Sequence, residues 1–318
     1  MRVAILDDYL QCARDVADWS RVTSRAEVTV FTEHLGAPDR VVDALRDFEI
    51  LCLMRDRQPL SADTLAELPK LAFISFTGGR NGTLDVAAAQ ARGIQISNTT
   101  RGVTSSTTEL IWALIMATVR QLPANEASLR SGRWQATLGS VLGGKTLGII
   151  GLGRLGKRIA DFGRCFDMSV VAWSPHLTDE RAAAAGARRV ERDELLSTAD
   201  VVTIHVPLNS GTRGLIGADE IALMKPTAFL VNTSRGPIVD EESLIRALYA
   251  GTIAGAGLDV YDTEPLPAEH PLLSAPNTVL LPHIGFVSRE NLAVFYQNSA
   301  DNIAAFLDGA PIRSVTAT

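Results

Sequence analysis

Residues 146–163 read TLGIIGLGRLGKRIADFG, which is an apolar run, a glycine-rich turn and an amphipathic run in succession. This order predicts a strand, a tight turn and a helix. The turn has the form G-x-G-x-x-G, in which the first glycine permits the bend, the second lets the backbone approach a pyrophosphate, and the third lets helix and strand pack closely. The positive end of the helix dipole favours the phosphate charge. The stretch therefore predicts a dinucleotide site at Gly151, Gly153 and Gly156.

Short apolar runs recur on both sides of this turn. Five precede it, at residues 3–6, 28–31, 50–54, 71–76 and 94–97, and six form a second series, at residues 147–150, 170–173, 201–206, 228–231, 256–260 and 279–281. Short, continuously apolar strands separated by helices are typical of parallel sheets that are covered on both faces. The sequence therefore predicts an α/β protein, with a small open sheet followed by a six-stranded, doubly wound nucleotide domain.

Two expected helices place the domain boundaries. Ser106 and Glu109 have the spacing of a capping box and precede an apolar run, which predicts a helix from about residue 107 to 120 between the two sheets. Residues 289–307 have helical periodicity and no strand follows them, so we expect this helix to pack back onto the first domain. The first domain is then discontinuous, with residues 1–103 plus 288–318, and residues 104–287 form the dinucleotide-binding domain.

The composition excludes several classes of protein. Of 318 residues 46% are hydrophobic and 21% are charged, as in soluble globular proteins. The net charge of −6 argues against nucleic acid as a partner, because phosphate binding needs a basic surface. The apolar start of the chain is too short for a signal peptide, and the longest apolar stretch, 110–119, is about half a membrane span. We therefore expect a cytoplasmic protein with no membrane partner. The three cysteines fit no metal spacing, so we expect no metal.

The choice of dinucleotide depends on the end of the second strand of this domain. An acidic residue about 20 positions beyond the glycines would bind the ribose hydroxyls of NAD, but Ser174 stands there, followed by Pro175 and His176. A serine does not repel the 2′-phosphate of NADP, yet no arginine stands at 175 or 176 to attract it, and His176 does so only when it is protonated. The sequence favours NAD, with Ser174 bonded to the ribose, and leaves NADP as the alternative.

Three residues with acid–base or anion-binding chemistry follow strands of the second series. Arg235 and His283 come at or just beyond the carboxyl ends of predicted strands, where ligands bind in open α/β sheets, and Glu264 lies in a loop after another strand. These are the parts needed to reduce a 2-keto acid. Arginine grips the carboxylate and polarises the ketone, histidine supplies the proton as hydride arrives, and glutamate supports the protonated histidine and holds its tautomer.

Taken together, GLGRLG (151–156), HVPLN (205–209), NTSRG (232–236), GLDVY (257–261), EP (264–265) and PHIG (282–285) resemble the D-2-hydroxyacid dehydrogenase family, which includes phosphoglycerate, glycerate and D-lactate dehydrogenases. The resemblance covers nearly the whole chain. It implies a Rossmann NAD(P)-binding domain inserted into a flavodoxin-like substrate domain, and a homodimer. It makes Arg235 the substrate-binding residue, His283 the acid/base and Glu264 its partner. The further cofactor residues that it implies are Arg154, Leu155, Ser174, Val206, Pro207, Thr233, Asp259 and Gly285.

The loop at residues 77–81 departs from the family pattern. It reads Thr-Gly-Gly-Arg-Asn where the family usually has Gly-x-Gly, so Gly78 and Gly79 are expected to offer amides to the substrate carboxylate and Arg80 replaces the second glycine of that pattern. Arg80 either selects the substrate or points to solvent. Arg55 resembles an arginine that phosphoglycerate dehydrogenases use near their phosphate, and it is the further substrate-binding candidate. Together with Arg57 these arginines hint at a second anionic group on the substrate.

The sequence thus predicts an NAD(P)-dependent reductase that turns a small 2-keto acid into a D-2-hydroxy acid in a cleft between its domains. The alternative is a dinucleotide sensor, because some relatives of the family act as NAD-linked corepressors through partner binding. The presence of Arg235, Glu264 and His283 together favours the enzyme.

Overall fold

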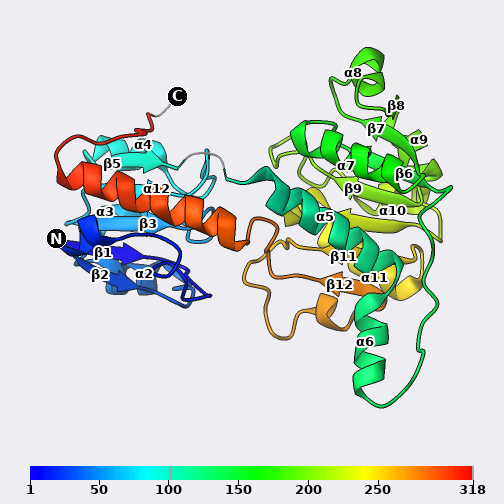
Figure 1. Cartoon of the computed structure of the whole chain (residues 1–318), viewed down its shortest axis with the longest axis horizontal. Helices are drawn as coiled ribbons and strands as arrows, with labels where there is room; N and C mark the ends of the chain where they lie inside the picture. Colours follow the sequence, from blue (N-terminus) through cyan, green and yellow to red (C-terminus); the bar gives the residue numbers. More distant parts are fainter. Residues whose placement is uncertain (100–101, 317–318) are drawn as a thin grey trace. The chain divides into compact units, whose positions relative to one another are not determined.

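The computed structural model describes residues 1–99 and 102–316. The chain divides into two compact units, unit 1 with residues 1–103 and 286–318 and unit 2 with residues 104–285. Each unit contains one parallel β-sheet (Figure 1). The chain returns to unit 1 at Phe286, slightly before the expected position after residue 287, because the Phe286 ring packs in the core of unit 1 with its centroid 6.3 Å from that of Phe295.

Unit 1 is a five-stranded parallel sheet of order β2-β1-β3-β4-β5, with helices on its faces. This is the strand order of flavodoxin-like domains, as expected. Its elements are β1 (Arg2–Ile5), α1 (Ser20–Thr23), β2 (Glu27–Val30), α2 (Pro38–Leu45), β3 (Ile50–Leu53), α3 (Ala62–Ala66), β4 (Phe73–Phe76), α4 (Val86–Ala91), β5 (Gln95–Asn98) and α12 (Arg289–Leu307). All four residues of β3 and of β4 are buried, which explains why these strands read as continuous apolar runs.

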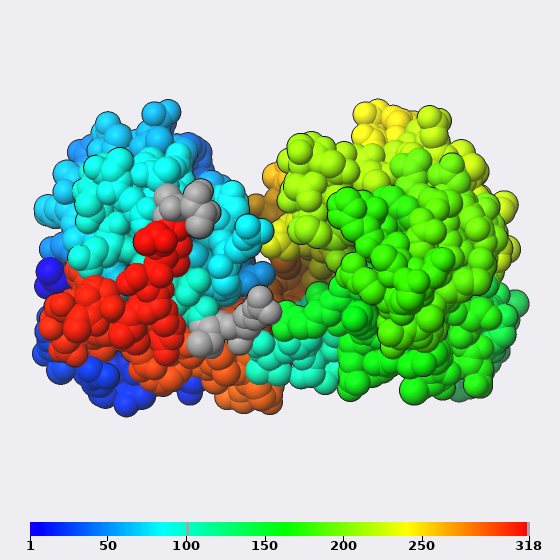
Figure 2. All heavy atoms as spheres, turned by 90° about the horizontal axis from the view of Figure 1, so that it is seen from above, coloured from blue at the N-terminus to red at the C-terminus, as the bar shows by residue number. Residues whose placement is uncertain are grey.

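The C-terminal helix α12 belongs to unit 1, as its periodicity predicted. Phe295, Tyr296 and Ile303 lie in the same buried cluster as Val3 and Ile50 of the sheet. The residues that follow α12 are held there too, because the Gln90 side-chain amide donates to the carbonyl of Val315 at 2.7 Å. Figure 2 shows this last segment in red against the cyan residues of unit 1.

Unit 2 is a seven-stranded parallel sheet of order β12-β11-β10-β9-β6-β7-β8. Its strands are β6 (Thr146–Ile150), β7 (Ser169–Trp173), β8 (Arg188–Arg189), β9 (Val201–Ile204), β10 (Phe229–Asn232), β11 (Gly255–Leu258) and β12 (Thr278–Leu280). Its helices are α5 (Thr104–Val119), α6 (Leu122–Arg130), α7 (Arg154–Cys165), α8 (Asp179–Ala183), α9 (Arg192–Thr198), α10 (Ala218–Leu223) and α11 (Glu241–Ala250), with 3-10 turns η1 (Gly236–Ile238) and η2 (Pro271–Ser274). The strand order reverses direction between β6 and β9, which is where doubly wound sheets bind their ligands.

Two expectations about unit 2 are wrong. Six strands were expected, but β8 adds a seventh at the edge; it has only two residues, and both are arginines, so no apolar run marks it. Ser106 does not cap a helix that begins near residue 107, because α5 already begins at Thr104. Inside this first turn the Ser106 hydroxyl donates to the carbonyl of Gly285 at 3.3 Å instead. Within the described residues no helix is long and apolar enough to cross a membrane.

Candidate active site

The glycine turn after β6 has the geometry that a dinucleotide needs. Gly151 has φ of +101°, and a Cβ there would lie 2.7 Å from the backbone carbon of His205. A Cβ at Gly156 would lie 2.2 Å from the carbonyl oxygen of Gly151, so strand and helix touch at this point. A Cβ built at Gly153 meets no described atom within 4 Å, which leaves open space in front of the turn. These three glycines therefore fit a pyrophosphate at the start of α7.

The start of α7 is compatible with a bound anion. Its first turn, which the structure describes in full, carries no acidic side chain. Arg154, the first residue of α7, is exposed and donates to the hydroxyl of Thr104 at 2.7 Å, and Leu155 is half-buried beside it. Both residues thus lie where the resemblance expects cofactor contacts.

Ser174 has a defined partner in the glycine turn. The backbone N–H of Leu152 donates to the Ser174 hydroxyl oxygen at 3.1 Å. Sequence reasoning missed this bond, and it also missed Arg181 of α8, whose guanidinium donates to the carbonyl of His176 at 3.1 Å. The sequence has no arginine at 175 or 176 that could attract a 2′-phosphate. The turn at residues 174–178 nevertheless brings Arg181 back to His176.

Three more cofactor candidates follow β9 and its neighbour β10. Val206 is buried and Pro207 is exposed after β9, and Thr233 is half-buried after β10. His205 directly follows β9, with its Nε2 3.1 Å from the hydroxyl of Thr203, and burial lowers the pKa of His205 to about 4. Because the His205 ring is neutral, we interpret it as a packing group at this edge of the sheet and not as an anion-binding group.

Asp259 follows β11 and organises the turn that carries His283. Its side chain is buried, and its two carboxylate oxygens accept the backbone N–H groups of Ile284 at 2.7 Å and Gly285 at 2.8 Å. Burial raises the pKa of Asp259 to about 6, although both amide bonds favour the ionised carboxylate. A Cβ at Gly285 would lie only 3.0 Å from the same carboxylate. Asp259 thus fixes the backbone immediately after His283.

His283 and Glu264 form the closest polar pair of this edge. His283 Nδ1 lies 2.5 Å from Glu264 Oε2, and the other Glu264 oxygen accepts the N–H of Tyr261 at 2.9 Å. A carboxylate accepts hydrogen bonds, so Nδ1 carries the proton and Nε2 is the other working atom of the ring. The side chains of His283 and Glu264 are 24% and 31% exposed, so a ligand can reach them. The arrangement is that of an acid–base histidine oriented by a carboxylate.

Arg235 belongs to a turn that is packed against the Glu264 loop. The buried Asn232 shapes this turn: its side-chain amide donates to the carbonyl of Arg235 at 2.9 Å and its oxygen accepts the N–H of Ser234 at 3.0 Å. The next residue, Gly236, touches the backbone of Tyr261 so closely that a Cβ would lie 2.0 Å from it. Since β10, β11 and β12 are neighbours in the sheet, the turns with Arg235, Glu264 and His283 lie at one edge of unit 2.

The substrate candidates of unit 1 lie at the carboxyl ends of β3 and β4. The Arg55 N–H donates to the Thr77 hydroxyl at 2.8 Å, and a Cβ at Gly78 would collide with the Arg55 guanidinium. The Gly78 N–H donates to the Thr99 hydroxyl at 2.8 Å, so this amide is used within unit 1. Gly79 is exposed.

Arg57 and Arg80 are the other two arginines of unit 1 that the sequence singles out. Arg80 is exposed. Arg57 donates to the carbonyl of Asp7 at 2.7 Å, and its guanidinium lies 4.5 Å from the centroid of the Tyr9 ring. The sequence identifies Arg57 as a cation, but it does not show that the Tyr9 ring packs against the guanidinium and orients it.

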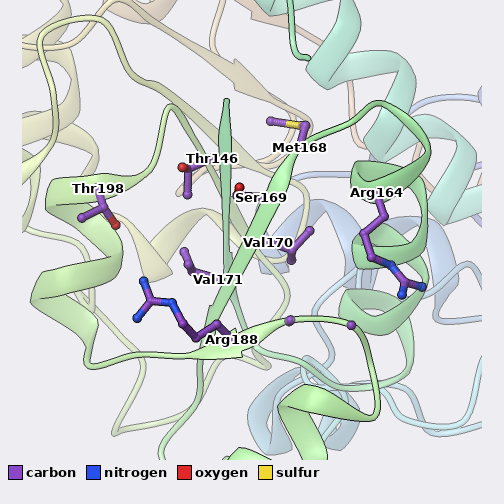
Figure 3. A pocket seen from close by; sticks show the side chains of 10 residues that line it. Thr146, Arg164, Met168, Ser169, Val170, Val171, Arg188 and Thr198 are labelled. Carbon is purple, nitrogen blue, oxygen red and sulfur yellow. The ribbon is translucent and has the colours of Figure 1, made fainter. Parts of the chain in front are cut away.

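A separate cavity lies elsewhere in unit 2. About 670 Å³ in volume, it is lined by the first residues of β6 and β7, Thr146 and Ser169, and by Arg164 and Arg188 (Figure 3). It is therefore at the amino ends of the strands, opposite the glycine turn. Each arginine is already bound by a carboxylate, Arg164 by Asp161 at 2.6 Å and Arg188 by Glu194 at 2.8 Å. Within the described residues, no group of three or more His, Cys, Asp or Glu side chains could hold a metal ion.

Comparisons with known proteins give the family of the chain. Residues 112–285 match the family model described as "D-isomer specific 2-hydroxyacid dehydrogenase, NAD binding domain". The chain is 39% identical to a glyoxylate reductase of Aeropyrum pernix, over 89% of this chain and 87% of that protein. It is 30% identical to a hydroxypyruvate reductase of Blautia hydrogenotrophica, over 99% of both chains. The crystal structure of a phosphoglycerate oxidoreductase from Vibrio cholerae matches with a TM-score of 0.92 at 35% identity, over 98% of this chain and 100% of that one.

Proposed function

The chain belongs to the D-isomer specific 2-hydroxyacid dehydrogenase family, and from this premise we propose that it reduces glyoxylate or hydroxypyruvate, or a keto acid of the same kind, to the D-2-hydroxy acid. Membership makes it an NAD(P)-dependent oxidoreductase with an NAD-binding domain. The observation that carries the proposal is the 2.5 Å pair of His283 and Glu264 at the edge that also holds the Arg235 turn.

Each of these side chains has a separate role in the proposed reaction. Arg235 binds the carboxylate of the keto acid and polarises its ketone, since a guanidinium presents paired donors to an anion. His283 donates the proton from Nε2 to the ketone oxygen as the carbon is reduced. Glu264 accepts from Nδ1, which fixes the tautomer and stabilises the ring while it is charged. Asp259 holds the turn after His283 in place.

The glycine turn is the proposed seat of the cofactor. Bound NADH supplies the hydride. Gly151, Gly153 and Gly156 leave room for its pyrophosphate, and Arg154, Leu155, Val206, Pro207, Thr233 and Gly285 are proposed to line the rest of the site. Ser174 and His176 take the ribose side, where Ser174 keeps its bond to Leu152 N–H. NAD is the proposed cofactor, because the matching family model is that of an NAD-binding domain. Arg181 beside His176 is a cation that favours the NADP alternative.

In unit 1, Arg55, Gly78, Gly79 and Arg80 are the proposed substrate contacts. Gly79 is the better amide donor of the two glycines, because the N–H of Gly78 already binds Thr99. A second anionic group on the substrate would be recognised by the arginines of this unit. Phosphohydroxypyruvate therefore belongs in the substrate test beside the uncharged-tail acids.

The test is loss of reduced-nicotinamide absorbance with glyoxylate, hydroxypyruvate, phenylpyruvate, oxaloacetate and phosphohydroxypyruvate, each with NADH and with NADPH. We expect turnover on glyoxylate or hydroxypyruvate with NADH, with kcat in the usual range of about 1–10³ s⁻¹. Best turnover on phosphohydroxypyruvate or oxaloacetate would instead show that the arginines read a second charge. If NADH binds and no acid is reduced, the proposed substrates are wrong, and the result favours the alternative that the protein is a dinucleotide sensor.

The Ser174→Asp variant isolates the cofactor preference in the same assay. A carboxylate at 174 can still accept the Leu152 N–H, so the turn is retained, while its charge repels a 2′-phosphate. We expect KM for NADPH to rise by about tenfold or more relative to KM for NADH, equivalent to roughly 1.4 kcal/mol. Ser174→Thr, which keeps the hydroxyl and adds no charge, is the control. Equal changes for both cofactors would remove residue 174 from the ribose site.

We propose that the protein is a homodimer that buries the region from α6 to residue 141. Leu122 and Leu129 of α6 are exposed, and in the segment that follows Trp134, Leu138 and Val141 are 78%, 96% and 67% exposed. Figure 1 shows α6 and this segment standing away from the sheet of unit 2. Apolar side chains gathered in this way mark an interaction surface. Sedimentation should give a dimer for the protein and a monomer for Leu138→Asp, and a monomeric protein would contradict the proposal.

A further inference from the structure

The loop that carries Glu264 contains no regular structure of its own. Residues 259–270 lie between β11 and η2 and form neither helix nor strand in the described chain. Glu264 is in the middle of this loop, and its contact with His283 joins two residues 19 positions apart. The distance between these two side chains therefore depends on what holds the loop.

One side chain outside the loop contacts it at two points. Glu241, the first residue of α11, accepts the backbone N–H of Asp262 with one oxygen at 3.3 Å. Its other oxygen lies 3.1 Å from Nε2 of His270. Glu264 lies between these two points in the sequence. We call Glu241 with these two partners, the Asp262 N–H and the His270 ring, the Glu241 clamp.

The second point of the clamp is itself firmly attached. His270 Nδ1 accepts the N–H of Leu272 at 3.3 Å, so Nδ1 has no proton and Nε2 donates to Glu241. Leu272 is fully buried in the core of unit 2. The side chains of His270 and Glu241 are 18% and 17% exposed, so their bond is shielded from water more than a surface pair is.

The surroundings show that the clamp is not a simple neutralisation of charge. Asp240 and Asp262 add negative charge next to Glu241, and burial, together with the carboxylates of Glu241 and Asp240, raises the pKa of Asp262. Arg213 and His270 oppose this effect. Glu241 thus accepts two donors although other carboxylates lie beside it.

We propose that Glu241 is a positioning residue for catalysis: by holding both sides of the loop through Asp262 N–H and His270, it keeps the Glu264 carboxylate against Nδ1 of His283. Glu241 itself touches neither substrate nor cofactor in this scheme. The inference rests on the proposed function of Glu264 and His283 as the acid–base pair.

The activity test compares Glu241→Ala with Glu242→Ala. Glu242 is the next residue of α11, is 83% exposed and pairs with Arg246, so its variant is a matched control with no contact to the loop. We expect Glu241→Ala to lower kcat by about tenfold, a part of the roughly 10²–10⁴-fold that a positioned proton donor contributes, with KM for NADH unchanged. The alkaline limb of the kcat profile for ketone reduction should move to lower pH, because the protonated His283 loses its partner. Glu242→Ala should change neither.

His270 supplies the rescue experiment. His270→Ala removes the second point of the clamp and should repeat the loss of kcat. His270→Gln places an amide N–H near the former position of Nε2 and should restore most of it. A role in stability alone would lower Tm in Glu241→Ala and leave kcat and the pH profile as in the wild type, and that result would overturn the inference.

A measurement without substrate separates this inference from the proposed function. The protein has five histidines, so their imidazole proton signals can be assigned in NMR spectra by substitution. Asp259 and Glu264 are the carboxylates whose charge acts on His283. The His283 signals should shift in Glu241→Ala as they do in Glu264→Gln, and should not shift in Glu242→Ala. If no acid is reduced but this shift occurs, the substrate proposal fails and the clamp stands; if reduction occurs without this shift, the clamp fails.

Discussion

Replacing Arg235 with alanine is expected to lower kcat/KM for the keto acid by about 10³-fold, or roughly 4 kcal/mol, because a buried charge-assisted pair to the substrate carboxylate is lost. The same guanidinium polarises the ketone, so kcat should fall as well as KM rise. The turn itself should survive, since Asn232 shapes it through the backbone of Ser234 and Arg235, although the bond from the Arg235 guanidinium to the Ser234 carbonyl at 2.7 Å is lost with the side chain. NADH affinity, measured by fluorescence titration, should therefore stay close to that of the wild type.

Two further variants sharpen this experiment. Arg235→Lys keeps the charge but loses the paired donors, and we expect it to recover only part of the activity. Arg246→Ala removes an exposed arginine that pairs with Glu242 on α11, and it should behave as the wild type. Full turnover in Arg235→Ala would show that the substrate carboxylate is bound by another residue.

Replacing His283 with asparagine is expected to lower kcat by about 10²–10⁴-fold, because this is what a positioned proton donor contributes. The choice of asparagine follows from the backbone: His283 has φ of +52°, a conformation that asparagine adopts more readily than alanine does. The variant thus removes the imidazole without adding backbone strain. Stopped-flow absorbance gives kcat, and equal Tm and NADH affinity would show that the turn is intact.

The pH profile provides the second readout for His283. In the wild type, ketone reduction should decline on the alkaline side as the proton donor is lost, and this decline should be absent in His283→Asn. If His283→Asn keeps more than about a tenth of the wild-type kcat, less than roughly 1.4 kcal/mol of the barrier depends on the imidazole and another acid is at work.

The sequence predicted the elements that bury apolar residues. Strands such as β3 and β10 are buried over their whole length, and α12 has an apolar face along one side, so their periodicity is plain. The edge strand β8 has no such signal because its two residues are arginines, one exposed and one half-buried. The start of α5 was misplaced because the capping-box spacing of Ser106 and Glu109 arises inside a helix as well as at its end.

The candidate site could be predicted in its residue types but not in its contacts. Arg235, Glu264 and His283 were marked by their position after strands, which requires only the order of elements. The bonds of Ser174 to Leu152 and of Glu241 to His270 depend on how separate turns meet, and no local pattern encodes them. The same holds for Arg181, which reaches His176 because a short turn folds back between them.

The buried Asp259 has a consequence for the stability of the fold. Its pKa rises from 3.8 to about 6 on folding, mainly through burial. A carboxyl group with a raised folded-state pKa contributes stability that is complete below pH 3.8 and is lost as the pH rises through about 6. At neutral pH the ionised group therefore lowers the free energy of unfolding. The ionised Asp259 carboxylate orders the turn after His283 and at the same time destabilises the folded chain. Stability and catalysis therefore make opposite demands on residue 259.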